Sequence, residues 1–247
     1  MAVNGAYLAM QIRQRVLGPV LSFSECIFRD VLPPFENLDR RADKIADDYY
    51  NRIGSQPAGE DEDVDMASVA EAAQDHSLSW FQMMVSVRQS MLNLLASGLY
   101  HLAEQQLADS CRDGSFTVRP PRDTKLEIVA DWYRDHFGLD LRTLPSWAVF
   151  DELRLVANAV KHGEGPATRQ LREIRVQLFS NPDYAEIYRE FEEAGIPPTL
   201  GPVFVPLSGE GLFVSEKLLK VYAEGAESFF REIAQHFESN AETYYPH

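Results

Sequence analysis

The stretch that decides the fold expected for this chain is residues 67–111, ASVAEAAQDHSLSWFQMMVSVRQSMLNLLASGLYHLAEQQLADSC. It contains no proline and only one glycine, Gly98, so it lacks the residues that most readily break a helix. The sequence Arg112–Asp113–Gly114 then ends the helical pattern. We therefore expect one very long helix here, or two nearly collinear ones, with the rest of the chain packed around it.

Most of the remaining chain also has helical spacing of apolar residues. Pro19 is expected to kink or split the first helical segment, because proline cannot donate the helical hydrogen bond. The helices that we expect outside the long one cover residues 5–31, 35–53, 123–137, 146–163, 166–179 and 183–194, and a last helix is capped by Ser215.

Two segments depart from the helical pattern. Residues 55–66, SQPAGEDEDVDM, carry five acidic residues and no basic one, which predicts an exposed, mobile linker. Residues 201–216, GPVFVPLSGEGLFVSE, alternate apolar and other residues around a turn-forming SGEG, which predicts a short β-hairpin. The expected fold is a mainly all-α single domain over residues 1–247, a helical bundle around one long helix, with a small β-hairpin before the C-terminal helix.

Composition and charge limit the classes of partner. The 247 residues carry a formal net charge of −15, which argues against an extended nucleic-acid surface or binding to an anionic membrane, but allows a small local basic site. Arg88 interrupts the best apolar run, so no transmembrane helix is expected. Cys26 and Cys111 have no metal or redox spacing, and no cofactor motif occurs. We expect a cytoplasmic protein with no metal and no cofactor.

The stretch ELRLVANAVKHGEG, residues 152–165, contains the candidate site. Arg154, Asn158 and His162 are spaced i, i+4, i+8, so they share one face of a helix. Asp151 and Lys161 fall on the same face, within an arc of about 100° on an ideal helix. The opposite face is apolar and belongs in the core.

Two interpretations of this polar face remain open. It can be a solvent-exposed face with an Asp151–Arg154 ion pair and cations near the helix C-terminus. Two residue types favour a site instead: Asn158 is a weak helix former in the middle of a helix, and histidine, as at position 162, exchanges a proton near neutral pH.

The sequence N-A-V-K-H-G, preceded by Arg154, resembles the signature of the HEPN superfamily, an all-helical group of nucleases and nucleotide-binding modules. The typical motif is an arginine, often an asparagine, three further residues and a histidine, near the end of the last core helix. Asn158 and His162 match the asparagine and the histidine, whereas Ala157 occupies the position of the arginine. Arg154 and Lys161 are the two cations that can replace it.

The resemblance implies metal-independent cleavage of RNA, in an effector of the toxin or phage-defence kind. His162 would act as the general base on a ribose 2′-hydroxyl, Arg154 and Lys161 would bind the phosphate, and Asn158 would orient the phosphate or the histidine. A second copy in a homodimer would supply the proton for the leaving group.

A second polar stripe follows the long helix from Ser79 to Glu104 and consists mostly of small uncharged residues. It can line a polar groove or let another backbone approach closely. In this stripe His101 and Glu104, spaced i, i+3, can support the site, hold a proton or metal, or form a buried hydrogen-bonded pair. The long helix is expected to face the Arg154–His162 helix across a cleft.

Three functional hypotheses follow. The first is a HEPN-like ribonuclease. The second is a HEPN-like interaction module that binds RNA, a nucleotide or another ligand without catalysis, which Ala157 and the acidic charge favour. The third is a helical scaffold without a site.

Overall fold

The computed structural model describes residues 4–55, 65–112, 119–195 and 201–240, which form helices and contain no strand. Residues 56–64, the centre of the expected acidic linker, lie outside the described residues. The helices are α1 (Gly5–Gln11), α2 (Gly18–Cys26), α3 (Leu38–Gly54), α4 (Met66–Ser110), α5 (Leu126–Phe137), α6 (Trp147–His162), α7 (Pro166–Ile174), α8 (Ala185–Glu193) and α9 (Glu216–Ser239).

Helix α4 is a single uninterrupted helix, which confirms the first of the two alternatives for residues 67–111. Its N-terminus is capped by Asp65, whose Oδ1 accepts a hydrogen bond of 3.0 Å from the N–H of Ala67. Gly98 lets α2 pack closely against α4, because a Cβ atom at position 98 would lie 3.3 Å from the ring of Phe23 in α2. Within the described ranges, each helix is too short or too polar to span a lipid bilayer.

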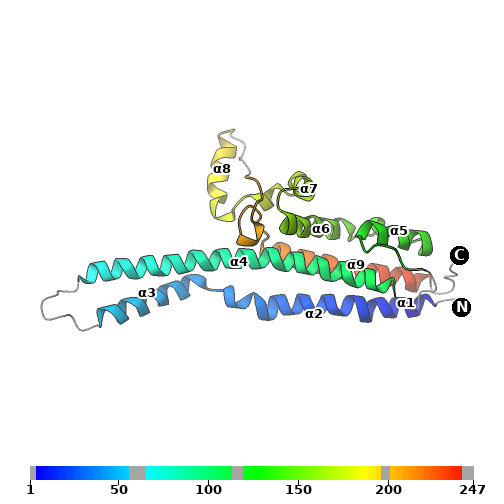
Figure 1. Cartoon of the computed structure of the whole chain (residues 1–247), viewed down its shortest axis with the longest axis horizontal. Coiled ribbons are helices and arrows are strands. Elements are labelled where there is room, and N and C mark those ends of the chain that lie inside the picture. Colours follow the sequence, from blue (N-terminus) through cyan, green and yellow to red (C-terminus); the bar gives the residue numbers. More distant parts are fainter. Residues whose placement is uncertain (1–3, 56–64, 113–118, 196–200, 241–247) are drawn as a thin grey trace.

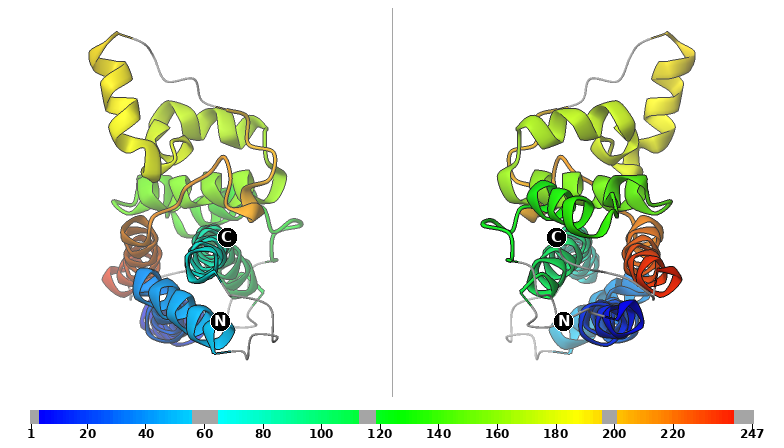
Figure 2. Two further views of the ribbon diagram at one scale, coloured as in Figure 1. Left: turned by 90° about the vertical axis from the view of Figure 1, so that its left-hand side faces the viewer. Right: turned by 90° about the vertical axis from the view of Figure 1, so that its right-hand side faces the viewer.

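The helices form layers around α4 (Figures 1 and 2). Helices α1 and α2 lie along one side of the α4–α9 layer, and α6 crosses its other side, with α7 and α8 beyond α6. The α3 helix and the first half of α4 extend away from the rest as a hairpin (Figure 1). Where α6 meets α9, Phe150 stacks on Phe229 with ring centroids 4.2 Å apart, and Tyr100 of α4 adds a third ring.

The N-terminal segment continues past Pro19 without a break in the helical run. A wider π-helical segment, Ile12–Leu17, precedes α2, and Pro19 is the second residue of α2. The run changes from a π-helix to an α-helix one residue before Pro19, and the backbone stays helical across the proline. A second π-helical segment, Ile27–Val31, ends the run.

The prediction of a β-hairpin at residues 201–216 is wrong. Residues 201–215, which we call the strap, cross α4 as an extended segment with one 3₁₀ turn at Pro206–Ser208. Their backbone groups bond to other parts of the protein: the N–H of Val203 donates to Glu164, that of Phe213 to the carbonyl of Leu178, and that of Val214 to Asn93. Because these groups have partners elsewhere, the alternating sequence does not pair with itself.

Asn93, at the middle of α4, holds the strap. It is fully buried, and its Nδ2 donates to the carbonyls of Pro206 and Leu212, each at 2.8 Å. Its Oδ1 accepts from the N–H of Val214 at 3.2 Å and from Gln89 at 3.1 Å. The sequence analysis gave two interpretations of the polar stripe on α4, and at Asn93 the structure shows the second: another backbone segment, the strap, packs closely against the stripe.

We predict that Asn93→Ala lowers the free energy of unfolding by about 2–4 kcal/mol, because it leaves buried strap groups without partners and opens a small cavity. Urea denaturation measures the change. Ser90→Ala is the matched control: its hydroxyl donates only to Ser86 of its own helix, so the expected change is within about 0.5 kcal/mol. Equal losses in the two variants would contradict this assignment.

Candidate functional site

The inward face of α6 carries a buried carboxylate that the sequence analysis missed. Glu152 is only 9% exposed and accepts two hydrogen bonds from Arg175, at 2.7 and 2.8 Å, and one of 2.7 Å from the hydroxyl of Tyr222. Burial and this bond to Glu152 raise the pKa of Tyr222, which keeps the phenol a hydrogen-bond donor. Because Glu152 points inward with the apolar face, the opposite face points outward.

The outward face of α6 contains the predicted site residues. Arg154, Asn158 and His162 line one hollow of about 400 Å³, together with Glu127 of α5 and the start of α7. The i, i+4, i+8 spacing therefore does bring these three side chains to one accessible hollow. Lys161 is exposed beside His162 but does not line the hollow.

Arg154 already has an anionic partner. Its Nε donates to Oδ1 of Asp151 at 2.7 Å, and both side chains are only partly exposed. Burial opposes the charged form of Arg154, but the hydrogen bond and charge of Asp151 outweigh it and hold the pKa of Arg154 above its ordinary value. The guanidinium thus remains charged, with its Nη groups as the donors left to meet an anion.

Asn158 and His162 differ in what they offer the hollow. The Nδ2 of Asn158 donates to the carbonyl of Arg154, one turn earlier, at 2.9 Å. The side chain keeps one further N–H as a donor and its amide oxygen as an acceptor, so it can bond to a phosphate oxygen, a hydroxyl or an imidazole N–H. His162 is the last residue of α6 and is exposed, so its ring is accessible to solvent and to a ligand.

Gly163 and the first turn of α7 close the hollow at the other end. Gly163 has φ +65°, and a Cβ atom here would lie 2.7 Å from the carbonyl oxygen of Val203 in the strap, so only glycine fits this turn. Thr168 donates to the carbonyl of Gly163 at 2.5 Å. The hollow is thus bordered by the N-terminus of α7, whose dipole favours an anion.

His101 and Glu104 lie outside the hollow, in a hydrogen-bonded group on α4. Nδ1 of His101 is 3.4 Å from Glu104, which also accepts a 2.8 Å hydrogen bond from the hydroxyl of Tyr100. Burial and the charge of Glu104 raise the pKa of Tyr100, while the nearby charge of Arg154 acts in the opposite sense. Among the described residues, no group of three or more histidine, cysteine, aspartate or glutamate side chains could hold a metal ion.

The relation between α4 and α6 differs from the expected cleft. Tyr100 of α4 and Phe150 of α6 have ring centroids 5.8 Å apart, and both are buried. The two helices are in direct contact, and the hollow lies beyond this contact, between α6, α5 and α7.

Position 157, where the resemblance expects an arginine, faces the core. Ala157 is 0% exposed, so this packing has no room for a long charged side chain there. Arg154 stands on the outward face, one turn before Asn158, and is the cation of this hollow. The departure from the motif is therefore part of how α6 packs.

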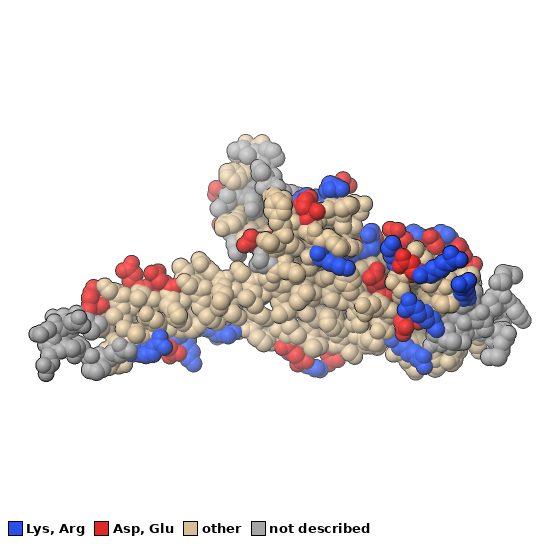
Figure 3. Space-filling view, viewed as in Figure 1, with Lys and Arg blue, Asp and Glu red and all other residues tan. Residues whose placement is uncertain are grey.

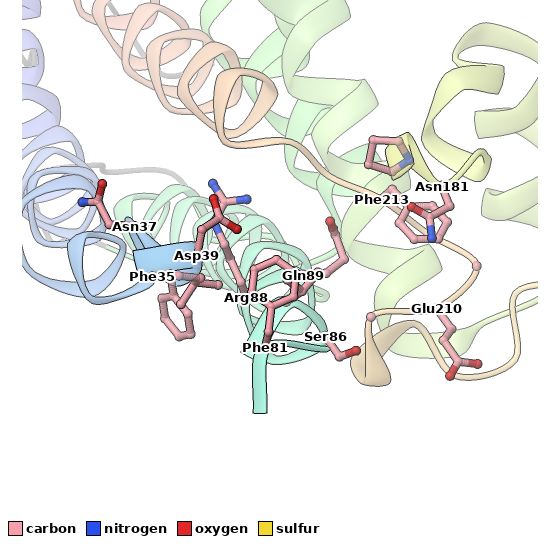
Figure 4. Close-up of a pocket in the computed structure, with 15 residues that line it drawn as sticks. Phe35, Asn37, Asp39, Phe81, Ser86, Arg88, Gln89, Asn181, Glu210 and Phe213 are labelled. Carbon is pink, nitrogen blue, oxygen red and sulfur yellow. The ribbon is translucent and has the colours of Figure 1, made fainter. Parts of the chain in front are cut away.

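A second hollow, of about 490 Å³, lies where the start of α3, the middle of α4 and the strap meet (Figure 4). Its walls include three phenylalanines from these segments: Phe35, Phe81 and Phe213. Asp39 and Glu210 also line it, and its one lining arginine, Arg88, is paired with Glu216 at 2.9 Å. These carboxylates disfavour an anion, as Asp151 and Glu127 do in the hollow at Arg154.

Charges of both signs are mixed on the face drawn in Figure 3. Lysine and arginine side chains alternate with aspartate and glutamate over the part that contains α5 and α6, and the middle of α4 shows neither. On this face, an anion therefore meets isolated cations and no broad basic surface.

Comparison of this chain with known family models, with curated proteins and with solved structures gives no match.

We predict that Asp151→Asn strengthens binding of inorganic phosphate about two- to fivefold, because it removes the anion that competes for Arg154 at a partly exposed pair. Isothermal titration calorimetry at fixed salt measures the affinity. Asp47→Asn, at an exposed position on the distant α3, is the charge-matched control and is expected to leave it unchanged. Weaker binding in Asp151→Asn would show that Asp151 instead holds Arg154 in its binding position.

Proposed function

We propose that this protein is a HEPN-like ribonuclease that cleaves RNA without a metal ion at the hollow formed by Arg154, Asn158 and His162. The observation that carries the proposal is that these three side chains, one turn apart along α6, line one accessible hollow. The exposed histidine supplies proton transfer, and the charged arginine and the N-terminus of α7 supply positive potential for a phosphate.

The chemistry follows from these groups. Neutral His162 takes the proton of a ribose 2′-hydroxyl, which the amide oxygen of Asn158 orients. The 2′-oxygen forms a bond to the adjacent phosphorus while the bond to the 5′-oxygen breaks. Arg154 stabilises the charge that develops on the phosphate oxygens, with Lys161 contributing at the rim. The products are a 2′,3′-cyclic phosphate and, once the leaving oxygen gains a proton, a 5′-hydroxyl.

The proton for the leaving oxygen comes, in this proposal, from His162 of the partner subunit in a homodimer. The exposed side chains of Met83, Val87 and Leu94 lie on one face of α4, within about 40° of each other on an ideal helix. Arg88 is the only charged residue between positions 77 and 97, and it is paired with Glu216. Two chains of net charge −15 repel each other least across such an uncharged face, which is the contact that we assign to the second copy.

The second candidate function is a non-catalytic module that binds RNA or a nucleotide. Two observations favour it: Asp151 already neutralises Arg154, and Ala157 leaves the site without the arginine of the motif. Such a module would use the same hollow for binding, and His162 would serve only as a hydrogen-bonding group.

We predict that purified protein cleaves single-stranded RNA in the presence of EDTA, and that His162→Ala lowers the rate about 10²- to 10⁴-fold because the general base is lost. Gel electrophoresis of a labelled RNA measures the rate. His76→Ala, at an exposed histidine on the α3–α4 hairpin, is the matched control. Binding without any cleavage by the wild type would favour the non-catalytic module.

We predict that the native protein has twice the chain mass of 28.0 kDa in solution, and that Leu94→Glu converts it to a monomer with little cleavage activity. The introduced carboxylates would meet across the uncharged face and repel each other. Light scattering after gel filtration measures the mass. Gln74→Glu, which adds the same charge at an exposed position far along α4, is the matched control and should remain a dimer. An active monomer would show that one chain holds every group the reaction needs.

A further inference from the structure

The strap presents one aromatic side chain to solvent. Phe204 is 75% exposed, the largest exposure of any large hydrophobic residue in the described chain, while its neighbour Val203 is 0% exposed. A single exposed apolar residue is ordinary on a protein surface, so the position of Phe204 matters more than its exposure.

The strap backbone around Phe204 is anchored on both sides. Arg172 donates to the carbonyl of Gly201 at 3.0 Å, Glu164 accepts from the N–H of Val203 at 3.1 Å, and Asn93 donates to the carbonyl of Pro206 at 2.8 Å. These bonds hold the backbone in place, so ligand binding has little backbone entropy to remove at this position.

The same backbone touches the end of the candidate site. A Cβ atom on Gly163 would lie 2.7 Å from the carbonyl oxygen of Val203 and 3.6 Å from that of Phe204. Gly163 follows His162 directly and lines the hollow with it. The exposed ring is therefore carried by the segment that contacts the phosphate hollow, within one residue of the contact.

We propose that Phe204 is the stacking platform for an unpaired base next to the phosphate held at Arg154 and His162. This inference rests on the proposed function. Bases in a duplex are stacked on one another and cannot offer a face to a side chain, whereas an unpaired base can lie on an aromatic ring. An aromatic ring accepts any base, so no sequence preference is expected from this contact.

The test compares binding of a labelled single-stranded RNA to full-length variants by fluorescence anisotropy. Phe204→Ala should weaken binding about 5- to 150-fold, and Phe204→Trp should retain it, because the indole offers an equal or larger face. Leu207→Ala is the matched control, since Leu207 is 54% exposed on the same strap but cannot stack. An abasic strand of the same length should bind wild type and Phe204→Ala equally.

The outcomes separate the inference from the function on which it rests. If the wild-type protein binds no RNA, the proposed function fails. If it binds single-stranded RNA and Phe204→Ala binds equally well, the function stands and the stacking role is overturned. Equal losses in Phe204→Ala and Leu207→Ala, or tighter binding to duplex, would also overturn it, because they indicate a general apolar contact or recognition of helical shape.

Discussion

A buried carboxylate and the buried apolar side chains beside it hold the inward face of helix α6, and the candidate site depends on them. Glu152 bonds both to Arg175, beyond α7, and to Tyr222 of α9, so one side chain joins three segments. A buried carboxylate that lost these partners would be costly, and this cost opposes any rotation of α6 that would turn Glu152 elsewhere. The face with Arg154, Asn158 and His162 is outward because the opposite face, with Glu152 and buried apolar side chains such as Leu153 and Val156, is held inward.

The strap extends this constraint to the ends of the hollow. Asn93 fixes the strap to α4. The carbonyl of Val203, in the strap, lies against Gly163, where a side chain on residue 163 would collide with it. The turn between α6 and α7 is therefore shaped from outside, by a segment about forty residues further along the chain. The proposed base platform and the proposed phosphate site belong to one hydrogen-bonded unit for this reason.

The charge balance of the hollow decides what it can bind. Arg154 is charged, but Asp151 is bonded to it and Glu127 lines the same space, so a phosphate gains less there than at an unopposed arginine. Under the proposed function, affinity for RNA comes in part from contacts that do not depend on charge, such as stacking. This agrees with a net charge of −15, which excludes tight binding through a broad basic surface.

The sequence by itself determined where the helices form and that Arg154, Asn158 and His162 share the outward face of α6. Both follow from local rules: the absence of proline over residues 67–111 predicts α4, and i, i+4, i+8 spacing places Arg154, Asn158 and His162 on one face. Only the tertiary structure decided the conformation of the strap, the burial of Glu152 and the presence of Glu127 in the hollow. Each of these depends on partners distant in sequence, such as Asn93 for the strap and Tyr222 for Glu152, and spacing along one segment carries no information about such contacts.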